Sequence, residues 1–122
     1  MLREIIRVKQ QPGEGHKRWF TDRYWDLFVW LDQDEIIRFQ LCYGKPADEK
    51  AVTWTGLGNL KHTRIDDGEP QAGIGMTPLM VQDDNFDSDA VSSRFLAEST
   101  EIDQTVAGFV YERIHSPTKK NP

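Results

Sequence analysis

Residues 25–43 constrain the fold most, because they hold two apolar runs joined by an acidic turn at 32–35. The first run, 26–31, is rich in aromatic and β-branched residues and too short for a typical helix, so it predicts a buried strand. The second run, 36–43, alternates, with Arg38 and Gln40 on one face and a predicted core face made of Ile37, Phe39, Leu41 and Tyr43. Together the two runs predict a β-hairpin.

Further strands are expected on both sides of this hairpin. Residues 2–10 alternate loosely and indicate a strand of mixed exposure, which the turn at 12–15 ends. Residues 51–55 predict a short strand that completes a three-stranded antiparallel meander, and 60–65 are a further candidate strand. The glycines, prolines and aspartates of 66–78 indicate a surface loop. The pattern therefore predicts an antiparallel meander sheet of four to five strands.

The last third of the chain changes to helical spacing. Asp87 or Ser88 is a candidate N-cap for a helix over about 89–97, whose buried side would carry Val91, Phe95 and Leu96. Residues 100–103 resemble a capping box, and the apolar residues after them predict an amphipathic helix over 101–115. Gly108 inside this helix suggests close contact with another backbone.

These elements define an α+β fold in which two C-terminal helices pack on one face of an antiparallel meander sheet. The length of 122 residues fits a single domain, which we place at 1–115, followed by a frayed tail at 116–122. Both faces of the first hairpin strand are apolar, with Leu27, Val29 and Leu31 on one side and Phe28 and Trp30 on the other. One layer of helices covers only one face, so we expect either a homodimer or another part of the chain to cover the second.

Composition limits the partners and the compartment. Fifteen basic and twenty acidic residues give a net charge of −5, which argues against a general binder of nucleic acid or of anionic membranes. Cys42 is the single cysteine, so no intrachain disulfide forms and a reducing compartment fits. The first residues lack the apolar core of a signal peptide, and no stretch reaches the ~20 apolar residues of a membrane helix. We therefore expect a cytoplasmic protein.

The stretch 16–25 interleaves aromatic rings with cations, a composition that suits a protein interface or single-stranded nucleic acid. The candidate binding residues are Arg18, Trp19, Phe20, Arg23, Tyr24 and Trp25. The alternative is that the rings belong to the core and that the cations lay their stems along it. Because the protein is acidic, we favour the core interpretation, rank a protein interface second, and expect no nucleic-acid partner.

A second group of residues could hold a metal ion. The densest set of potential ligands is His62, Asp66, Asp67 and Glu69, and such carboxylates with a histidine suit a divalent cation. The spacing lacks the alternating carboxylates of an EF-hand, and Asp67-Gly68 is ordinary turn chemistry. We therefore favour a solvated turn and expect no cofactor. Cys42 stands in a strand without a helix start or glycine-rich elbow beside it, which indicates an inert thiol and no catalytic nucleophile.

Short motifs spread over nearly the whole chain carry a resemblance. They are RWF, DLFVW, FQLCY, the TW strand, DDGE, TPLMV and the pattern F-x3-S-x2-I-x6-F that runs from Phe95 to Phe109. Together they resemble a set of small uncharacterised bacterial proteins of unknown function. The resemblance implies a stand-alone cytoplasmic domain and carries over no activity or catalytic residue.

Two functions follow as hypotheses, and the residues do not decide whether the chain is an enzyme. The first is a small non-enzymatic binding or protein-interaction module, in which a sheet face or the 66–78 loop meets a protein or a small apolar ligand. The second is a small metal-dependent or hydrolase-like enzyme that uses His62 with Asp66, Asp67 and Glu69.

Overall fold

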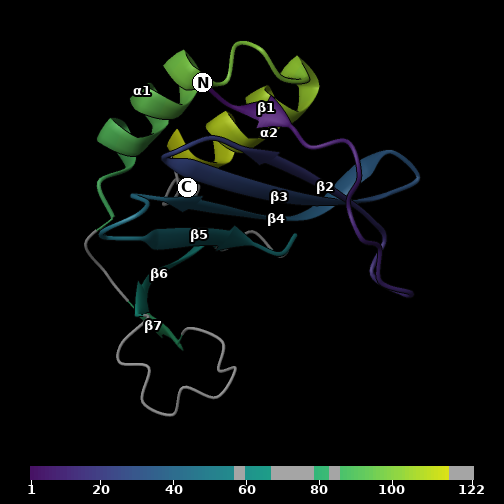
Figure 1. Cartoon of the computed structure of the whole chain (residues 1–122), viewed down its shortest axis with the longest axis horizontal. Helices are drawn as coiled ribbons and strands as arrows, with labels where there is room; N and C mark the ends of the chain where they lie inside the picture. Colours follow the sequence, from purple (N-terminus) through teal and green to yellow (C-terminus); the bar gives the residue numbers. More distant parts are fainter. Residues whose placement is uncertain (57–59, 67–78, 83–85, 116–122) are drawn as a thin grey trace, which may run out of the picture.

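The computed structural model describes residues 1–56, 60–66, 79–82 and 86–115, with the backbone alone for 65, 66 and 79–82. The described strands form one antiparallel sheet in chain order (Figure 1). They are β1 (Arg3–Glu4), β2 (His16–Thr21), β3 (Trp25–Asp32), β4 (Glu35–Tyr43), β5 (Lys50–Trp54), β6 (Leu60–Asp66) and β7 (Leu79–Gln82). Two helices follow, α1 (Ser88–Glu98) and α2 (Gln104–His115). The expected tail at 116–122 and most of the expected 66–78 loop lie outside the described residues.

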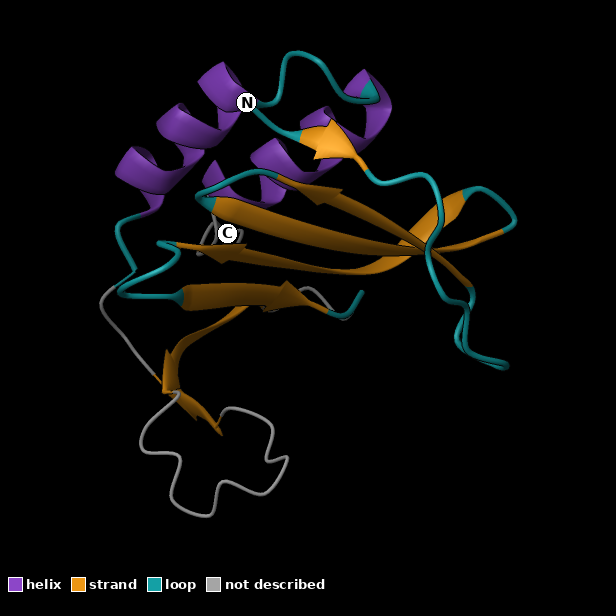
Figure 2. Cartoon of the chain, in the orientation of Figure 1, coloured by secondary structure: helices purple, strands orange, loops and turns teal. Residues whose placement is uncertain are grey.

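The predicted α+β meander with two C-terminal helices is confirmed, although the strands outnumber the expected four to five. Both helices lie over the same face of the sheet (Figure 2). On that face β3 and β4 place Trp25 opposite Tyr43, Leu27 opposite Leu41 and Val29 opposite Phe39. These side chains are buried against residues of both helices, which are Val91, Phe95, Val106, Val110 and Ile114. The core is therefore the layer between the central strands and the two helices.

A β-bulge between Trp30 and Leu31 changes one predicted face. Trp30 pairs with Arg38, but Leu31 pairs with Ile36, so the pairing skips Ile37. Ile36 is 8% exposed and belongs to the core, whereas Ile37 is 39% exposed. The prediction that Ile37 shares the core face is therefore wrong, because simple alternation does not hold across a bulge.

The first predicted strand, 2–10, is shorter than expected. Only Arg3 and Glu4 pair with β2 as a strand. The Ile5 N–H adds one hydrogen bond to the Trp19 carbonyl at 2.8 Å. Further along, the Gln10 side chain occupies the edge of β2. Its Nε2 donates to the Lys17 carbonyl at 2.9 Å, and its Oε1 accepts from the Lys17 N–H at 2.8 Å. One amide side chain thus satisfies the backbone at an edge that would otherwise be open to another strand.

The helix starts follow their caps. Asp87 caps α1 as expected and accepts from the Ala90 N–H at 3.1 Å. The second helix begins at Gln104, three residues later than predicted, because Asp103 accepts from the Thr105 N–H at 2.9 Å and acts as the cap. Leu96, predicted for the buried side of α1, is 53% exposed. That assignment is wrong because the buried side of α1 is centred on Val91, Ser92 and Phe95.

Replacing Gly108 by alanine should raise the free energy of unfolding by about 1 kcal/mol, the difference in helix propensity between the two residues. Gly108 lies inside α2 on its exposed side, and a Cβ there would meet nothing within 4 Å. The expected close approach of another backbone is therefore wrong. Urea denaturation measures the change, and a destabilised variant would show that this position does need glycine.

Candidate functional site

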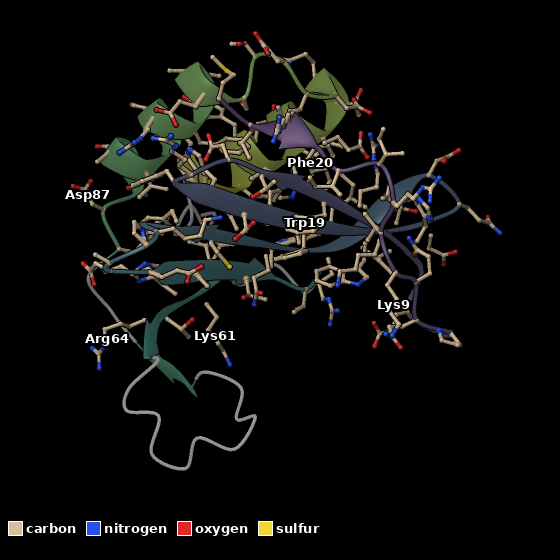
Figure 3. The ribbon with its side chains drawn as sticks, viewed as in Figure 1. Lys9, Trp19, Phe20, Lys61, Arg64 and Asp87 are labelled. Carbon is tan, nitrogen blue, oxygen red and sulfur yellow. The ribbon has the colours of Figure 1, made fainter. Side chains whose placement is uncertain are left out.

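The face of the sheet away from the helices is aromatic at its centre. In the register, Trp19 on β2 lies opposite Phe28 on β3, and Trp30 on β3 lies between Lys17 on β2 and Arg38 on β4. We call these five residues the aromatic shelf. No helix in the described part of the chain covers it (Figure 2). In Figure 3, Lys9 and Lys61 also lie on this side of the sheet.

The rings of the shelf contact one another and are partly covered by its own cations. Trp19 and Phe28 stack with their centroids 5.8 Å apart, and Phe28 and Trp30 follow at 6.4 Å. The Arg38 guanidinium carbon lies 3.8 Å from the Trp30 ring centroid, and the Lys17 Nζ lies 5.0 Å from that of Phe28. Trp30 is 9% exposed, whereas Trp19 and Phe28 are half-buried. The shelf therefore presents ring edges and cationic heads to solvent.

Asp26 fixes one end of the shelf. Its Oδ1 accepts from the Trp19 indole Nε1–H at 2.9 Å and from the Thr21 hydroxyl at 2.7 Å. Its Oδ2 pairs with the Lys45 Nζ at 2.8 Å. One partly buried carboxylate thus orients the Trp19 ring and holds a lysine from the loop after β4 against this face.

The other end of the shelf opens into a groove of about 610 Å³. Its lining residues are Gly13, Glu14, Gly15, Trp30, Asp32, Ile37, Arg38 and Thr55. Gly15 has φ +80°, and a Cβ on it would lie 2.7 Å from the Leu31 carbonyl oxygen, so the turn at this wall requires glycine. The Trp30 indole N–H is buried and has no hydrogen-bond partner within the described residues. The groove therefore combines one cation with two carboxylates, and the buried indole N–H is not accessible from it.

Two of the six predicted binding residues lie in the core instead. Phe20 and Trp25 are 0% exposed, because β2 and β3 alternate and turn these rings toward the helices. Trp25 meets Phe95 edge to face at 5.6 Å and donates from its Nε1 to the Glu98 carboxylate at 2.7 Å. The structure thus places these two rings in the core, which is the interpretation that the sequence favoured for this stretch.

The other four predicted residues are separated from one another. Tyr24 packs on the core side under Arg94, whose guanidinium carbon lies 3.4 Å from the ring centroid. Arg18 pairs with Glu4 at 2.8 Å and with Asp103 at 3.1 Å, and these hydrogen bonds raise its pKa above the usual value despite partial burial. Arg23 lies exposed in the turn between β2 and β3. Trp19 alone among the six belongs to the shelf, so the structure does not gather the predicted set.

The other shelf residues were missed as a site, although their signal was in the sequence. The sequence marks Phe28 and Trp30 as a second apolar strand face, and Lys17 is one of the cations in the stretch 16–25. The pairing of β2 with β3 was not predicted, and it is this pairing that brings Lys17 to Trp30. Arg38 was placed correctly on the face away from the core.

His62, the first predicted metal ligand, lies in an aromatic environment. Its Nε2 is 2.6 Å from the Tyr43 hydroxyl, and its ring stacks on Phe86 with centroids 4.7 Å apart. His62 is 7% exposed. The Asp66 side chain, Asp67 and Glu69 lie outside the described residues, so the four-residue metal set stays a prediction. Within the described residues, no three of His, Cys, Asp and Glu are grouped as a metal site would require.

The Cys42 thiol is buried, with 5% of the residue exposed. Burial raises its pKa to about 12, and the nearby carboxylates of Glu49 and Asp26 act in the same direction. Because the thiolate is the reactive form, a thiol with this pKa is inert at neutral pH. The geometry thus agrees with the inert thiol expected from its strand position.

Comparison with protein-family models, with curated proteins and with solved structures finds no match to this chain. Among the residues that the structure describes, no helix has both the length and the apolar composition needed to cross a membrane.

Proposed function

We propose that the protein is a small cytoplasmic, non-enzymatic binding module that recognises another protein through the aromatic shelf. The observation that carries this proposal is the gathering of Trp19, Phe28 and Trp30 with two cations on a face that no described helix covers. Tryptophan, other aromatic residues and arginine are enriched in protein interfaces, where they supply most of the binding energy. A reducing compartment suits a chain whose single cysteine is a free thiol.

The enzyme hypothesis has less support. His62, its central residue, is buried, and its Nε2 is within hydrogen-bond distance of Tyr43. The groove beside Trp30 brings together Arg38, Glu14 and Asp32, and the described residues that line it include no histidine, cysteine or serine to act as a nucleophile or as a base near neutral pH. A charged groove of this kind suits binding better than proton transfer.

The positive charge of the shelf argues against the expected homodimer. A symmetric pairing of two shelves would bring Lys17 and Arg38 of both copies into one interface, where like charges oppose association. These cations also cover part of Phe28 and Trp30, which reduces the apolar area that a second copy would need to bury. We therefore propose a partner other than a second copy.

Selection of displayed random peptides on the purified protein tests the proposal. Enriched peptides should bind the wild type with Kd values of about 1–100 μM, and Phe28→Ala should weaken them at least about tenfold because it removes the central ring of the shelf. Phe28 is half-buried and lies outside the core, so this variant should fold, as circular dichroism would verify.

Leu96→Ala is the matched control, because Leu96 is 53% exposed on the helical side. Peptide affinity should be unchanged in this variant. Enriched peptides that bind the Phe28→Ala variant as well as the wild type would show that the binding surface lies elsewhere. Light scattering over a range of concentrations completes the test, since a dimer that Phe28→Ala dissociates would assign the shelf to self-association.

A further inference from the structure

The cations of the open face have no carboxylate partners within the described residues. Lys17 and Arg38 lie over rings of the shelf, and neither they nor Lys61 forms an ion pair there, in contrast to Arg18 and Lys45. In the sheet register Lys61 lies opposite Thr53, Thr53 lies opposite Gln40, and Gln40 lies opposite Phe28. Lys61 therefore lies on the same face of the sheet as the shelf. The face therefore carries three cations that form no ion pair among the described residues.

The Asp26 carboxylate on this face is already engaged. Asp26, two residues from Phe28 along β3, accepts hydrogen bonds from Trp19 and Thr21 and pairs with Lys45. Asp26 cannot also neutralise Arg38 or Lys61 without giving up these contacts. Because the chain as a whole has a net charge of −5, this positive face is set apart from an acidic remainder.

We propose that the partner bound by the open face is an acidic, extended segment of another protein, with carboxylates that pair with Lys17, Arg38 and Lys61. This inference rests on the proposed function, which supplies the face, and adds the chemistry of its ligand. Complementary charge steers such a segment to the face and sets its register, while the ring edges of Trp19 and Phe28 supply apolar contact.

The extent of the cations suits an extended chain. Lys17, Arg38 and Lys61 lie on alternate strands β2, β4 and β6, and Lys17 and Arg38 are about 10 Å apart across the sheet. The register sets Lys61 two residues further along the strands, about 12 Å from Arg38. An extended segment of about eight residues is ~25 Å long, which is enough to reach all three cations.

The groove beside Trp30 marks one end of this cationic surface. Arg38 and Trp30 line it together with Glu14 and Asp32. The two carboxylates repel a further anion at these walls, so we expect the acidic segment to meet Arg38 from the side of the shelf.

Single-stranded nucleic acid fits these observations less well. Bases bind proteins by stacking on open ring faces. Here Arg38 covers the Trp30 ring at 3.8 Å, Lys17 lies over Phe28, and Trp19 and Phe28 stack on each other. A net charge of −5 also opposes a polyanion at long range. An acidic protein segment needs only the cations and the ring edges.

Fluorescence anisotropy with labelled eight-residue peptides tests the inference. The probe alternates glutamate with valine, and its matched control has glutamine at every glutamate position. At about 50 mM salt the acidic peptide should bind at least about tenfold tighter than the glutamine peptide, and the difference should shrink to about twofold at ~300 mM salt. Arg38→Gln and Lys17→Gln should each weaken the acidic peptide by about three- to tenfold.

Arg94→Gln is the control for these variants, because it removes the same charge from α1 on the other side of the sheet. It should leave the affinity for the acidic peptide unchanged. Equal weakening by Arg94→Gln would show that only net charge matters and would overturn the proposed site.

The remaining outcomes separate the inference from the proposed function. Equal binding of both peptides, lost in Phe28→Ala, overturns the acidic ligand but keeps the shelf as a binding surface. If the acidic peptide does not bind, the inference is overturned. If the selection of displayed peptides also yields no binder, the proposed function is overturned as well. A labelled eight-nucleotide oligothymidine that binds more tightly than the acidic peptide, with affinity lost in Trp19→Ala, would replace the acidic protein by nucleic acid.

Discussion

Replacing Phe95 by alanine should lower the free energy of unfolding by about 3–5 kcal/mol, the range measured for large-to-small changes in closed cores. Phe95 is 0% exposed on α1, and its ring meets Trp25 edge to face with centroids 5.6 Å apart at an angle of 77°. Alanine would leave a cavity between the first helix and the centre of the sheet. Because a domain of this size has a total stability of about 5–15 kcal/mol, the variant should be severely destabilised.

Urea denaturation followed by tryptophan fluorescence measures this loss. Leu96→Ala is the matched control, because Leu96 is the next residue of the same helix and is 53% exposed. We expect that control to change the free energy of unfolding by about 0.5 kcal/mol or less. Similar losses in the two variants would contradict the orientation of α1 on the sheet. Phe109 on α2 is half-buried, so its truncation should cost less than that of Phe95.

Asp26→Ala should be the most damaging single change on the open face, with an expected loss of about 2–3 kcal/mol in the free energy of unfolding. The substitution removes the acceptor of the Trp19 indole N–H at 2.9 Å and of the Thr21 hydroxyl at 2.7 Å, together with the Lys45 ion pair. The Asp26 side chain is 17% exposed, so solvent replaces these contacts only in part.

Two controls define what Asp26 contributes. Asp26→Asn keeps one acceptor oxygen and loses the charge, so we expect about half of the alanine effect. Asp48→Ala removes a carboxylate whose side chain is 74% exposed and whose ion pair with Lys50 lies at the surface, so thermal unfolding should not change measurably. The near-ultraviolet circular dichroism of Asp26→Ala should also change, because the Trp19 ring loses its anchor. An unaltered spectrum together with unaltered stability would contradict this role.

The loss of the Trp19 anchor also connects stability with the proposed function. Asp26→Asn should retain much of the fold while loosening the Trp19 ring, so peptides selected on the wild type should bind this variant more weakly. The Asp26 contacts therefore identify one way in which the fold pre-organises the shelf.

Much of the sheet and both helices were predictable, because their signals are local. The β3–β4 hairpin follows from two apolar runs around an acidic turn, and α1 follows from the Asp87 cap. The wrong predictions at Ile37 and at the start of α2 each affect only a few residues, but their causes involve contacts between elements. The bulge depends on how β3 and β4 pair, and the start of α2 depends on Asp103, which also pairs with Arg18 on β2.

The candidate site was less predictable than the fold. The sequence places Trp19, Phe20, Tyr24 and Trp25 close together along the chain, but alternation divides them between the two faces of the sheet. Residues far apart in the sequence, such as Lys17 and Arg38, become neighbours through Trp30 once β2, β3 and β4 pair. A cluster in the chain is therefore a poor guide to a cluster on a strand surface.

By itself, the sequence determined the α+β class, the central hairpin and the two C-terminal helices, because periodicity, turns and caps act within a few residues of the chain. Only the tertiary structure decided which aromatic face is closed by the helices and which is left to the shelf. That choice depends on packing between elements, since Phe95 on α1 meets Trp25 on β3 and the pairing of β2 with β3 brings Lys17 opposite Trp30. No local pattern specifies these contacts.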